Sequence, residues 1–226
     1  MTVRARVAMD ERRRFALAIP GGSIAAAFLP VLARAPLAWD STALFWVDER
    51  FVPTDHEESN AGAARRLLAG SSAAEKAHWY PIEISRSLEA TAHAYARRLV
   101  RAVGTPPVLD VALLGVGEDG HVASLFPGRQ PADREWVAIE RAAPKPPPER
   151  ITLTYATLAA ADVVCLAAFG AHKAPIVRAL FDPASRDLPA FRVLAGAREA
   201  WIFVDQDAAS LLDPTVRSRG RDAGGD

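Results

Sequence analysis

The sequence has few of the residues that identify many classes of protein. Its 226 residues include one cysteine, Cys165, so it can form neither an intramolecular disulfide nor a cysteine-based metal site. Cys165 lies in an apolar run, which predicts a buried structural thiol and not a nucleophile. No apolar segment is long enough to span a membrane. The sequence also contains no P-loop, no G-x-S-x-G elbow and no His-x-x-x-His pair.

The chain has no surplus of either charge. Its 27 basic and 27 acidic residues cancel, whereas broad nucleic-acid binding requires an excess of cations. Only three of the cations are lysines, at Lys76, Lys145 and Lys173. The residues before Phe15 contain no apolar stretch, so we expect no signal peptide. We therefore expect a cytoplasmic protein with no nucleic-acid or membrane partner.

Short apolar runs alternate with longer amphipathic segments. The runs predict strands at 15–19, 43–47, 111–116, 136–139, 162–168 and 201–204, and the segments predict helices over 23–34, 60–69, 86–103 and 171–181. Continuous apolar runs are typical of a parallel sheet with helices on both faces. We therefore predict one doubly wound, mostly parallel, Rossmann-like α/β domain over 1–226, with a disordered tail at 215–226. The proline-rich stretch 142–148 predicts a stiff loop and no domain boundary.

Ligands of open α/β sheets bind beyond the carboxyl ends of the strands. Gly21, Gly22 and Ser23 follow the first predicted strand. Two glycines let the backbone approach a ligand, and the following helix N-terminus attracts an anion. Ser23 fits a simple helix N-cap equally well.

Charged residues follow two further predicted strands. Asp48, Glu49 and Arg50 come after the second strand, and arginine suits bidentate contact with phosphate or carboxylate. An ion pair within the loop, among these same three residues, is the alternative explanation for their charges. Lys173 falls in the first turn of a predicted helix, where a cation opposes the helix dipole and therefore suggests a bound anion. A freely solvated lysine is the alternative at this position.

The loop after the strand at 111–116 carries the clearest chemistry. The glycines of residues 115–120 match the G-x-G-x-x-G motif of dinucleotide-binding sites. However, Glu118 and Asp119 would place carboxylates where the pyrophosphate of a dinucleotide should lie. Pro127 also stops any crossover helix, so we reject a dinucleotide site. What remains is His121 two residues after Asp119, a plausible general base. The other histidines, His56, His78, His93 and His172, are expected to have surface or packing roles.

At these residues the chain resembles the glucosamine-6-phosphate isomerase/6-phosphogluconolactonase family. The matching blocks are Phe45–Pro53 with Ser59-Asn60, Leu114–Gly128, Arg150–Thr154 with Gly170 and Lys173-Ala174, and Leu188–Ala190. The resemblance implies the fold of glucosamine-6-phosphate deaminase, no metal and no organic cofactor. It also implies hydrolysis of the δ-lactone of 6-phosphogluconate, in the pentose phosphate pathway.

By position, the resemblance implies roles for individual residues. His121, with Asp119, is expected to be the catalytic base, and Arg50 and Lys173 to bind substrate and phosphate. The predicted substrate contacts also include Gly21, Gly22, Ser23, Asp48 and Gly117. Backbone N–H groups of residues 117–120, or Arg50, are candidates to stabilise an oxyanion. One departure is Ile24-Ala25, where the family usually has Thr-Pro.

Two alternatives have different chemistry. A deaminase–isomerase shares the Asp-Gly-His sequence but places a glutamate a few residues later, whereas residues 123–126 contain no carboxylate. A non-catalytic sugar-phosphate sensor usually carries a DNA-binding helical module, and the residues before Phe15 are too few to form one. We expect a small-molecule sugar-phosphate lactone as substrate and a monomer or small homo-oligomer.

Overall fold

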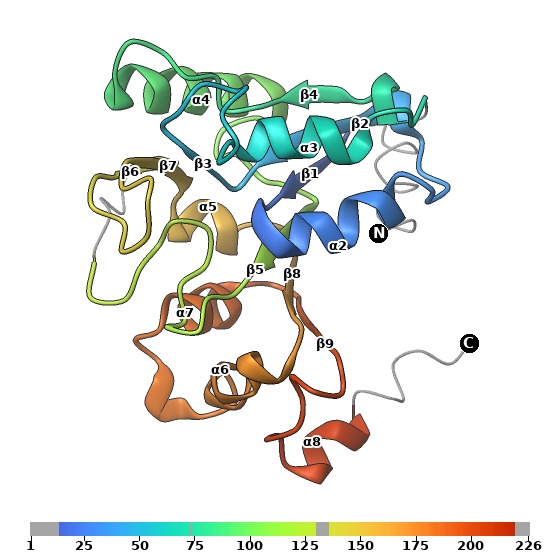
Figure 1. The fold of residues 1–226 in the computed structure, drawn as a ribbon, viewed down its shortest axis with the longest axis vertical. Helices are drawn as coiled ribbons and strands as arrows, with labels where there is room; N and C mark the ends of the chain where they lie inside the picture. Colours follow the sequence, from blue (N-terminus) through green and yellow to red (C-terminus); the bar gives the residue numbers. More distant parts are fainter. Residues whose placement is uncertain (1–13, 73, 130–135, 220–226) are drawn as a thin grey trace.

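The computed structural model describes residues 14–72, 74–129 and 136–219. A six-stranded sheet, with all neighbours parallel, has the order β4-β2-β1-β5-β8-β9 (Figure 1). Its strands are β1 (Phe15–Ile19), β2 (Thr42–Trp46), β4 (His78–Tyr80), β5 (Val111–Gly115), β8 (Val163–Ala168) and β9 (Ala200–Val204). The chain extends the sheet from β1 towards β4, then returns and extends it from β5 towards β9. Doubly wound sheets bind ligands where this direction reverses, between β1 and β5.

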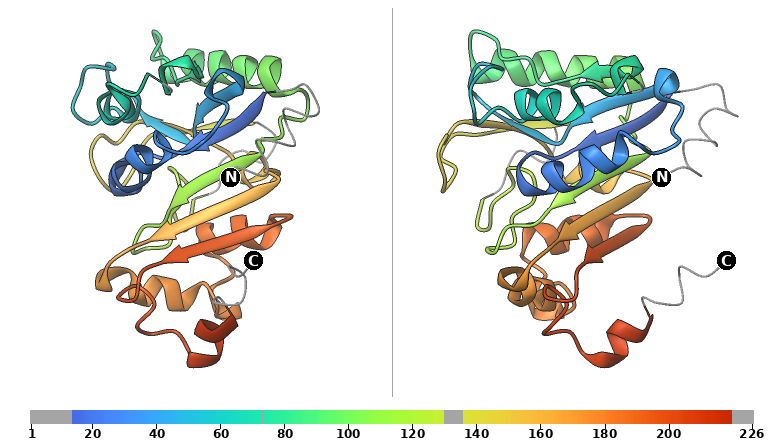
Figure 2. Two further views of the ribbon diagram at one scale, coloured as in Figure 1. Left: turned by 90° about the vertical axis from the view of Figure 1, so that its right-hand side faces the viewer. Right: turned by 45° about the vertical axis from the view of Figure 1, so that its right-hand side comes forward.

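Helices cover both faces of this sheet, as predicted. Helices α2 (Gly22–Leu32) and α3 (Asn60–Leu68) contact each other on one face, and α5 (Tyr155–Ala159) and α7 (Pro189–Gly196) contact each other on the opposite face (Figure 2). Every residue of β1, β2 and β8 is buried, which explains why these strands are continuously apolar. The predicted doubly wound α/β fold is confirmed.

A second, antiparallel sheet lies beside the first. Its order is β3-β7-β6, with β3 at Asp48–Arg50, β7 at Arg150–Leu153 and β6 at Val137–Glu140. Helix α4 (Leu88–Val103) packs on β6 and β7. The run at 136–139, expected to join the parallel sheet, belongs to this antiparallel one. Since β3 follows β2 after the single residue Val47, the chain passes directly from the large sheet into the small one.

Three of the predicted helices match the structure closely. α3 and α4 begin where the side chains of Ser59 and Ser87 accept a backbone N–H, which is ordinary N-capping. The predicted helix at 171–181 contains a 3-10 turn at Ala171–Lys173 and the short helix α6 at Ala174–Ala179. Sequence analysis did not predict the strands β3, β4 and β7 or the helices α5, α7 and α8 (Pro214–Arg219).

Two predictions concern the ends of the chain, which the structure describes only in part. The disordered tail predicted at 215–226 begins in helix α8, and residues 220–226 lie outside the described part. Residues 1–13, where no signal peptide was expected, also lie outside it. Within the described ranges, no helix is long and apolar enough to cross a membrane.

The two sheets share one hydrophobic core. Residues of β1, β5 and β8 belong to the same buried cluster as residues of β6 and β7. The single domain over 1–226 stays a prediction. Cys165 lies inside β8 and is 7% exposed, as predicted for a structural thiol. Burial raises the pKa of this thiol to about 11, so it stays neutral in the physiological range.

Candidate active site

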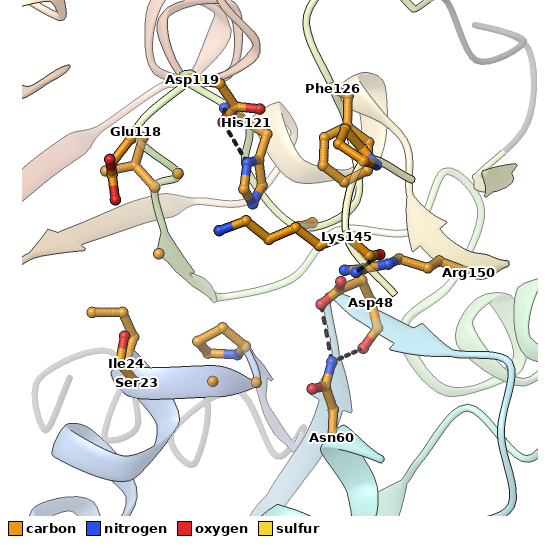
Figure 3. Close-up of a pocket in the computed structure, with 18 of the residues that line it drawn as sticks. Ser23, Ile24, Asp48, Asn60, Glu118, Asp119, His121, Phe126, Lys145 and Arg150 are labelled. Atoms are coloured by element: carbon orange, nitrogen blue, oxygen red, sulfur yellow. Dashed lines mark hydrogen bonds and ion pairs between the residues drawn. The ribbon is translucent and has the colours of Figure 1, made fainter. Parts of the chain in front are cut away.

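A pocket of about 780 Å³ opens at the carboxyl ends of β1, β5 and β8. Its position is the reversal point of the sheet, where the fold is expected to bind a ligand. All residues predicted for the site line this one pocket: Gly21, Gly22, Ser23, Asp48, Arg50, Gly117, Asp119, His121 and Lys173. Figure 3 shows how the labelled side chains converge on it. Their individual roles stay predictions.

The loop after β1 leads into an uncapped helix. Gly21 is the N-cap of α2, and no side chain accepts a hydrogen bond there. Ser23 therefore lies inside the first turn, and the N-cap interpretation of Ser23 is wrong. A Cβ on Gly21 would lie 1.8 Å from Oδ1 of Asn60, so this close approach requires glycine. The free N–H groups at the start of α2 form a wall that favours an anion.

The departure from the family at Ile24 has a visible structural consequence. Ile24 is only 7% exposed, and a Cβ on Gly115 would lie 2.9 Å from its Cγ1. Helix α2 thus packs closely on β5 through an apolar side chain. A hydroxyl at this position is replaced by a packing contact.

Asp48 is a buried carboxylate that joins three parts of the chain. It is 6% exposed, and its Oδ2 accepts a hydrogen bond from the Ser124 hydroxyl at 2.7 Å. Its Oδ1 accepts from Nδ2 of Asn60 at 3.3 Å, and Asn60 also donates to the Asp48 backbone oxygen (Figure 3). Asp48 thereby fixes β3 to the start of α3 and to the loop after β5.

Glu49 has a structural role. It is 1% exposed, and its carboxylate accepts the N–H groups of Asn60 at 2.7 Å and Ala61 at 2.8 Å at the start of α3. Burial raises the pKa of Glu49, and the hydrogen bonds from Ala61, Asn60 and the Arg50 backbone only partly counter this effect. Glu49 thus satisfies the free N–H groups of α3 and is not available to a ligand.

Arg50 is already paired on one side. Its NH1 group donates to the backbone oxygen of Glu58 at 2.6 Å and to the Glu58 carboxylate at 2.9 Å. The alternative of a loop ion pair is therefore partly right, with Glu58 as the partner instead of Asp48 or Glu49. The Nε atom of Arg50 is buried, and no hydrogen-bond partner for it lies among the described residues. The described hydrogen bonds also leave the NH2 group unengaged, so Arg50 keeps donors that Glu58 does not occupy.

The loop after β5 forms a tight turn, and residues 116–129 contain no helix, in agreement with the rejection of a dinucleotide site. The Gly117 N–H donates to the backbone oxygen of His121 at 2.8 Å, and the Gly120 N–H donates to the backbone oxygen of Gly117 at 3.0 Å. These two donors are engaged within the loop. The suggestion that they stabilise an oxyanion is therefore wrong for Gly117 and Gly120.

His121 and Asp119 form the pair expected of an oriented base. Nδ1 of His121 lies 2.5 Å from Oδ1 of Asp119, which also accepts the His121 backbone N–H. Partial burial acts to raise the pKa of Asp119, but the hydrogen bonds from His121 outweigh it and lower the pKa. An ionised carboxylate holds the proton on Nδ1, which leaves Nε2 free to accept one, and Figure 3 shows this nitrogen pointing into the pocket. Phe126 packs against the ring, with centroids 4.8 Å apart.

The pocket residues without a predicted site role include Lys145, Arg150 and His172. Lys145 lies on the proline-rich loop between β6 and β7, and Arg150 begins β7. His172 was expected at the surface; it is exposed, and it also lines the pocket. Two features of the sequence could have indicated Lys145 and Arg150: lysine is rare in this chain, and Arg150 lies in the block Arg150–Thr154 that resembles the family. Neither signal shows that the β6–β7 hairpin folds over the pocket.

Within the described residues, the unpaired charge of the pocket is mainly positive. The carboxylates of Asp48, Glu58 and Asp119 all have partners. Among the described residues, no hydrogen bond or ion pair engages the ammonium groups of Lys145 and Lys173 or the carboxylate of Glu118, whose charge acts on Lys173. Two cations thus stand against one carboxylate. This imbalance favours an anionic ligand.

Comparisons with known proteins agree with this geometry. Residues 1–202 match the family described as glucosamine-6-phosphate isomerases/6-phosphogluconolactonase. A 6-phosphogluconolactonase of Rattus norvegicus is 37% identical over 210 residues, which cover 89% of this chain and 82% of that protein. A probable chloroplastic 6-phosphogluconolactonase 3 of Oryza sativa is 36% identical over 225 residues, covering 91% and 68%.

The fold is shared with solved structures. The 6-phosphogluconolactonase of Trypanosoma brucei superposes with a TM-score of 0.79 at 27% identity, covering 93% of this chain and 91% of that one. The sequence match, the fold and the pocket at the reversal point of the sheet agree. The chain belongs to the glucosamine-6-phosphate isomerase/6-phosphogluconolactonase family.

Proposed function

We propose that the chain hydrolyses 6-phosphoglucono-δ-lactone to 6-phosphogluconate, the lactone-opening step of the pentose phosphate pathway. The observation that carries this proposal is the His121–Asp119 pair, 2.5 Å apart, in a pocket whose unpaired charge is mainly positive. Relatives named 6-phosphogluconolactonase at 36–37% identity support it.

The chemistry needs only a base and water. A δ-lactone is an activated ester, so no covalent nucleophile is required. Nε2 of His121 takes a proton as the water oxygen bonds to C1, and the carbonyl electrons move to the carbonyl oxygen. The C1–O5 bond then breaks, and the ring oxygen takes the proton back from His121. A positioned base of this kind contributes about 10²–10⁴-fold to the rate.

Binding of the distant phosphate orients the ring for this attack. The start of α2, from Gly21 to Ser23, offers free N–H groups, and Lys173 offers a half-buried cation. Arg50 contributes a donor that Glu58 does not occupy. The deaminase alternative is not favoured, because Ala123 and Phe126 line the pocket near His121 and that stretch supplies no carboxylate.

The test is a coupled assay with freshly prepared lactone and 6-phosphogluconate dehydrogenase, with spontaneous hydrolysis subtracted. We expect turnover well above the uncatalysed rate. Release of ammonia from glucosamine 6-phosphate would instead assign the deaminase activity. Binding of the lactone without turnover would assign a sensor.

The cytoplasmic location and the small oligomer expected from the sequence stay predictions. The rice relative is named chloroplastic, so membership of the family does not fix the compartment of this chain. Fractionation of the native host and size-exclusion chromatography with light scattering test the two predictions.

A further inference from the structure

The loop that joins β6 to β7 is held in place before any ligand binds. Arg150 is 6% exposed; its Nε donates to the backbone oxygen of Pro147 at 3.0 Å, and its NH2 group donates to the backbone oxygen of Lys145 at 2.9 Å. The Ala143 N–H donates to the backbone oxygen of Pro148 at 2.9 Å and closes the loop. Prolines further restrict the backbone. The main chain at Lys145 is thus preorganised.

The side chain of Lys145 points from this loop into the pocket. Pro144, Lys145 and Pro146 all line the cavity. Figure 3 shows the lysine extending towards the side of the pocket where His121 and Ser23 lie. Within the described ranges, no hydrogen-bond acceptor or carboxylate pairs with its ammonium group. A cation brought to a cavity on a rigid loop and left unpaired is arranged to meet an anion.

Lys173 lines the same pocket from the 3-10 turn that follows β8. Its pKa is lowered by burial; Glu118 and Asp119 act to raise this pKa, and the charge of Lys145 acts to lower it. The Lys173 ammonium is thus attracted by the Glu118 carboxylate and repelled by the Lys145 ammonium. A doubly charged anion between the two ammonium groups would relieve this repulsion, and a phosphate monoester carries nearly two charges at neutral pH.

The two arginines of the pocket already make other contacts, Arg50 only with part of its guanidinium. NH1 of Arg50 is paired with Glu58, and Arg150 holds the loop carbonyls. Among the lysines and arginines that line the pocket, Lys145 and Lys173 are the ones without a hydrogen-bond or ion-pair partner in the described part of the chain. We propose that Lys145 binds the phosphate group of the substrate together with Lys173. Arg150 is then a positioning residue for Lys145. This inference rests on the proposed function.

The test compares Lys145→Met with Lys145→Arg and with Lys76→Met, a matched removal of a lysine outside the pocket. We measure kcat/KM for 6-phosphoglucono-δ-lactone and for the unphosphorylated glucono-δ-lactone. Loss of one charge-assisted contact lowers the ratio of the two values by about tenfold or more in Lys145→Met. Lys145→Arg should restore most of the ratio, and Lys76→Met should leave it unchanged.

An unchanged ratio in Lys145→Met would overturn the inference. An equal loss on both lactones would also overturn it, because it would place Lys145 at the reacting carbonyl. Calorimetry measures the affinity for inorganic phosphate without any turnover. It therefore separates the proposal that Lys145 binds phosphate from the proposal that the chain hydrolyses the lactone. If the wild-type chain fails to open lactones, a weaker phosphate affinity in Lys145→Met still supports the phosphate contact, and an unchanged affinity refutes it.

Discussion

The imidazole of His121 fills the space that a side chain on Gly117 would need. A Cβ on Gly117 would lie 2.0 Å from Nδ1 of His121 and 2.5 Å from Oδ1 of Asp119. Both distances are far inside van der Waals contact, so the His121–Asp119 pair forms only above a glycine. Gly117 was predicted to contact the substrate; the structure gives it the additional role of leaving room for the base.

This relationship predicts the effect of Gly117→Ala. The added methyl group must displace the imidazole or the carboxylate, so we expect kcat to fall about a hundredfold or more, as for loss of a general base. The coupled assay measures kcat, and circular dichroism checks the fold. Gly70→Ala is the control, because it strains a residue at φ +79° with open space around the new Cβ. A Gly117→Ala variant with wild-type kcat would contradict the geometry.

Asp119→Asn removes the charge that holds the Nδ1 proton while keeping the side-chain shape. We expect kcat to fall by about 10² or more, because the tautomer of His121 is no longer fixed. Retention of full activity would remove Asp119 from the mechanism. The KM for the lactone should change little, since Asp119 is bonded to His121 and not predicted to hold the phosphate.

The pKa of Asp119 also predicts a pH dependence of stability. Because this pKa is lower in the folded chain than its ordinary value of 3.8, the folded state binds the proton less readily than the unfolded state. Asp119 therefore stabilises the fold above about pH 4, and this contribution is lost as the pH falls through the lower folded value. The Tm difference between wild type and Asp119→Asn should shrink from about pH 6 to about pH 3. A difference that grows on acidification would contradict this sign.

Cys165 should be chemically inert in the folded protein. Burial raises its pKa to about 11, and only the thiolate reacts with alkylating reagents. Mass spectrometry after iodoacetamide treatment at about pH 8 should find label on the urea-unfolded chain and none on the native chain. Cys165→Ala should keep kcat. Rapid labelling of the native protein together with loss of activity would reveal a thiol role that the structure does not contain.

Arg150→Lys tests the loop that carries Lys145. Lysine keeps the charge but cannot donate to the backbone oxygens of both Lys145 and Pro147 in the same geometry. We expect KM for the phosphorylated lactone to rise several-fold with a smaller change in kcat. The free energy of unfolding should fall by about 1–3 kcal/mol, which denaturant titration measures. Loss of kcat with unchanged KM would argue against a positioning role.

The sequence is sufficient to predict five of the six strands of the large sheet, all but the edge strand β4, because the central strands are buried on both faces and have continuously apolar sequences. The bounds of β1 are predicted to the residue, and those of β2, β5, β8 and β9 to within one residue. The small sheet was not predicted as a unit. Its strand β3 is the polar triplet Asp48–Arg50, and β7 opens with a buried arginine. β3 has no apolar residue, and β7 alternates polar and apolar residues over only four positions, so neither forms a continuous apolar run.

The candidate site was predictable where motif and strand end coincide, as for Gly21, Asp48 and His121. Lys145 was not, because its role depends on how the β6–β7 hairpin lies over the pocket, and this position is set by long-range pairing of β3 with β7. The pairing of Arg50 with Glu58 and the burial of Glu49 also depend on tertiary packing. The local sequence shows which of these residues are charged, but it does not show which groups they contact in the fold.

The central claim is that His121 acts as the general base in the opening of the lactone. The decisive measurement is the kcat of His121→Ala with fresh 6-phosphoglucono-δ-lactone, corrected for spontaneous opening, beside its calorimetric affinity for 6-phosphogluconate. We predict that kcat falls by about 10²–10⁴-fold while the folded variant still binds 6-phosphogluconate with near-wild-type affinity. A His121→Ala variant that opens the lactone at the wild-type rate would contradict the account.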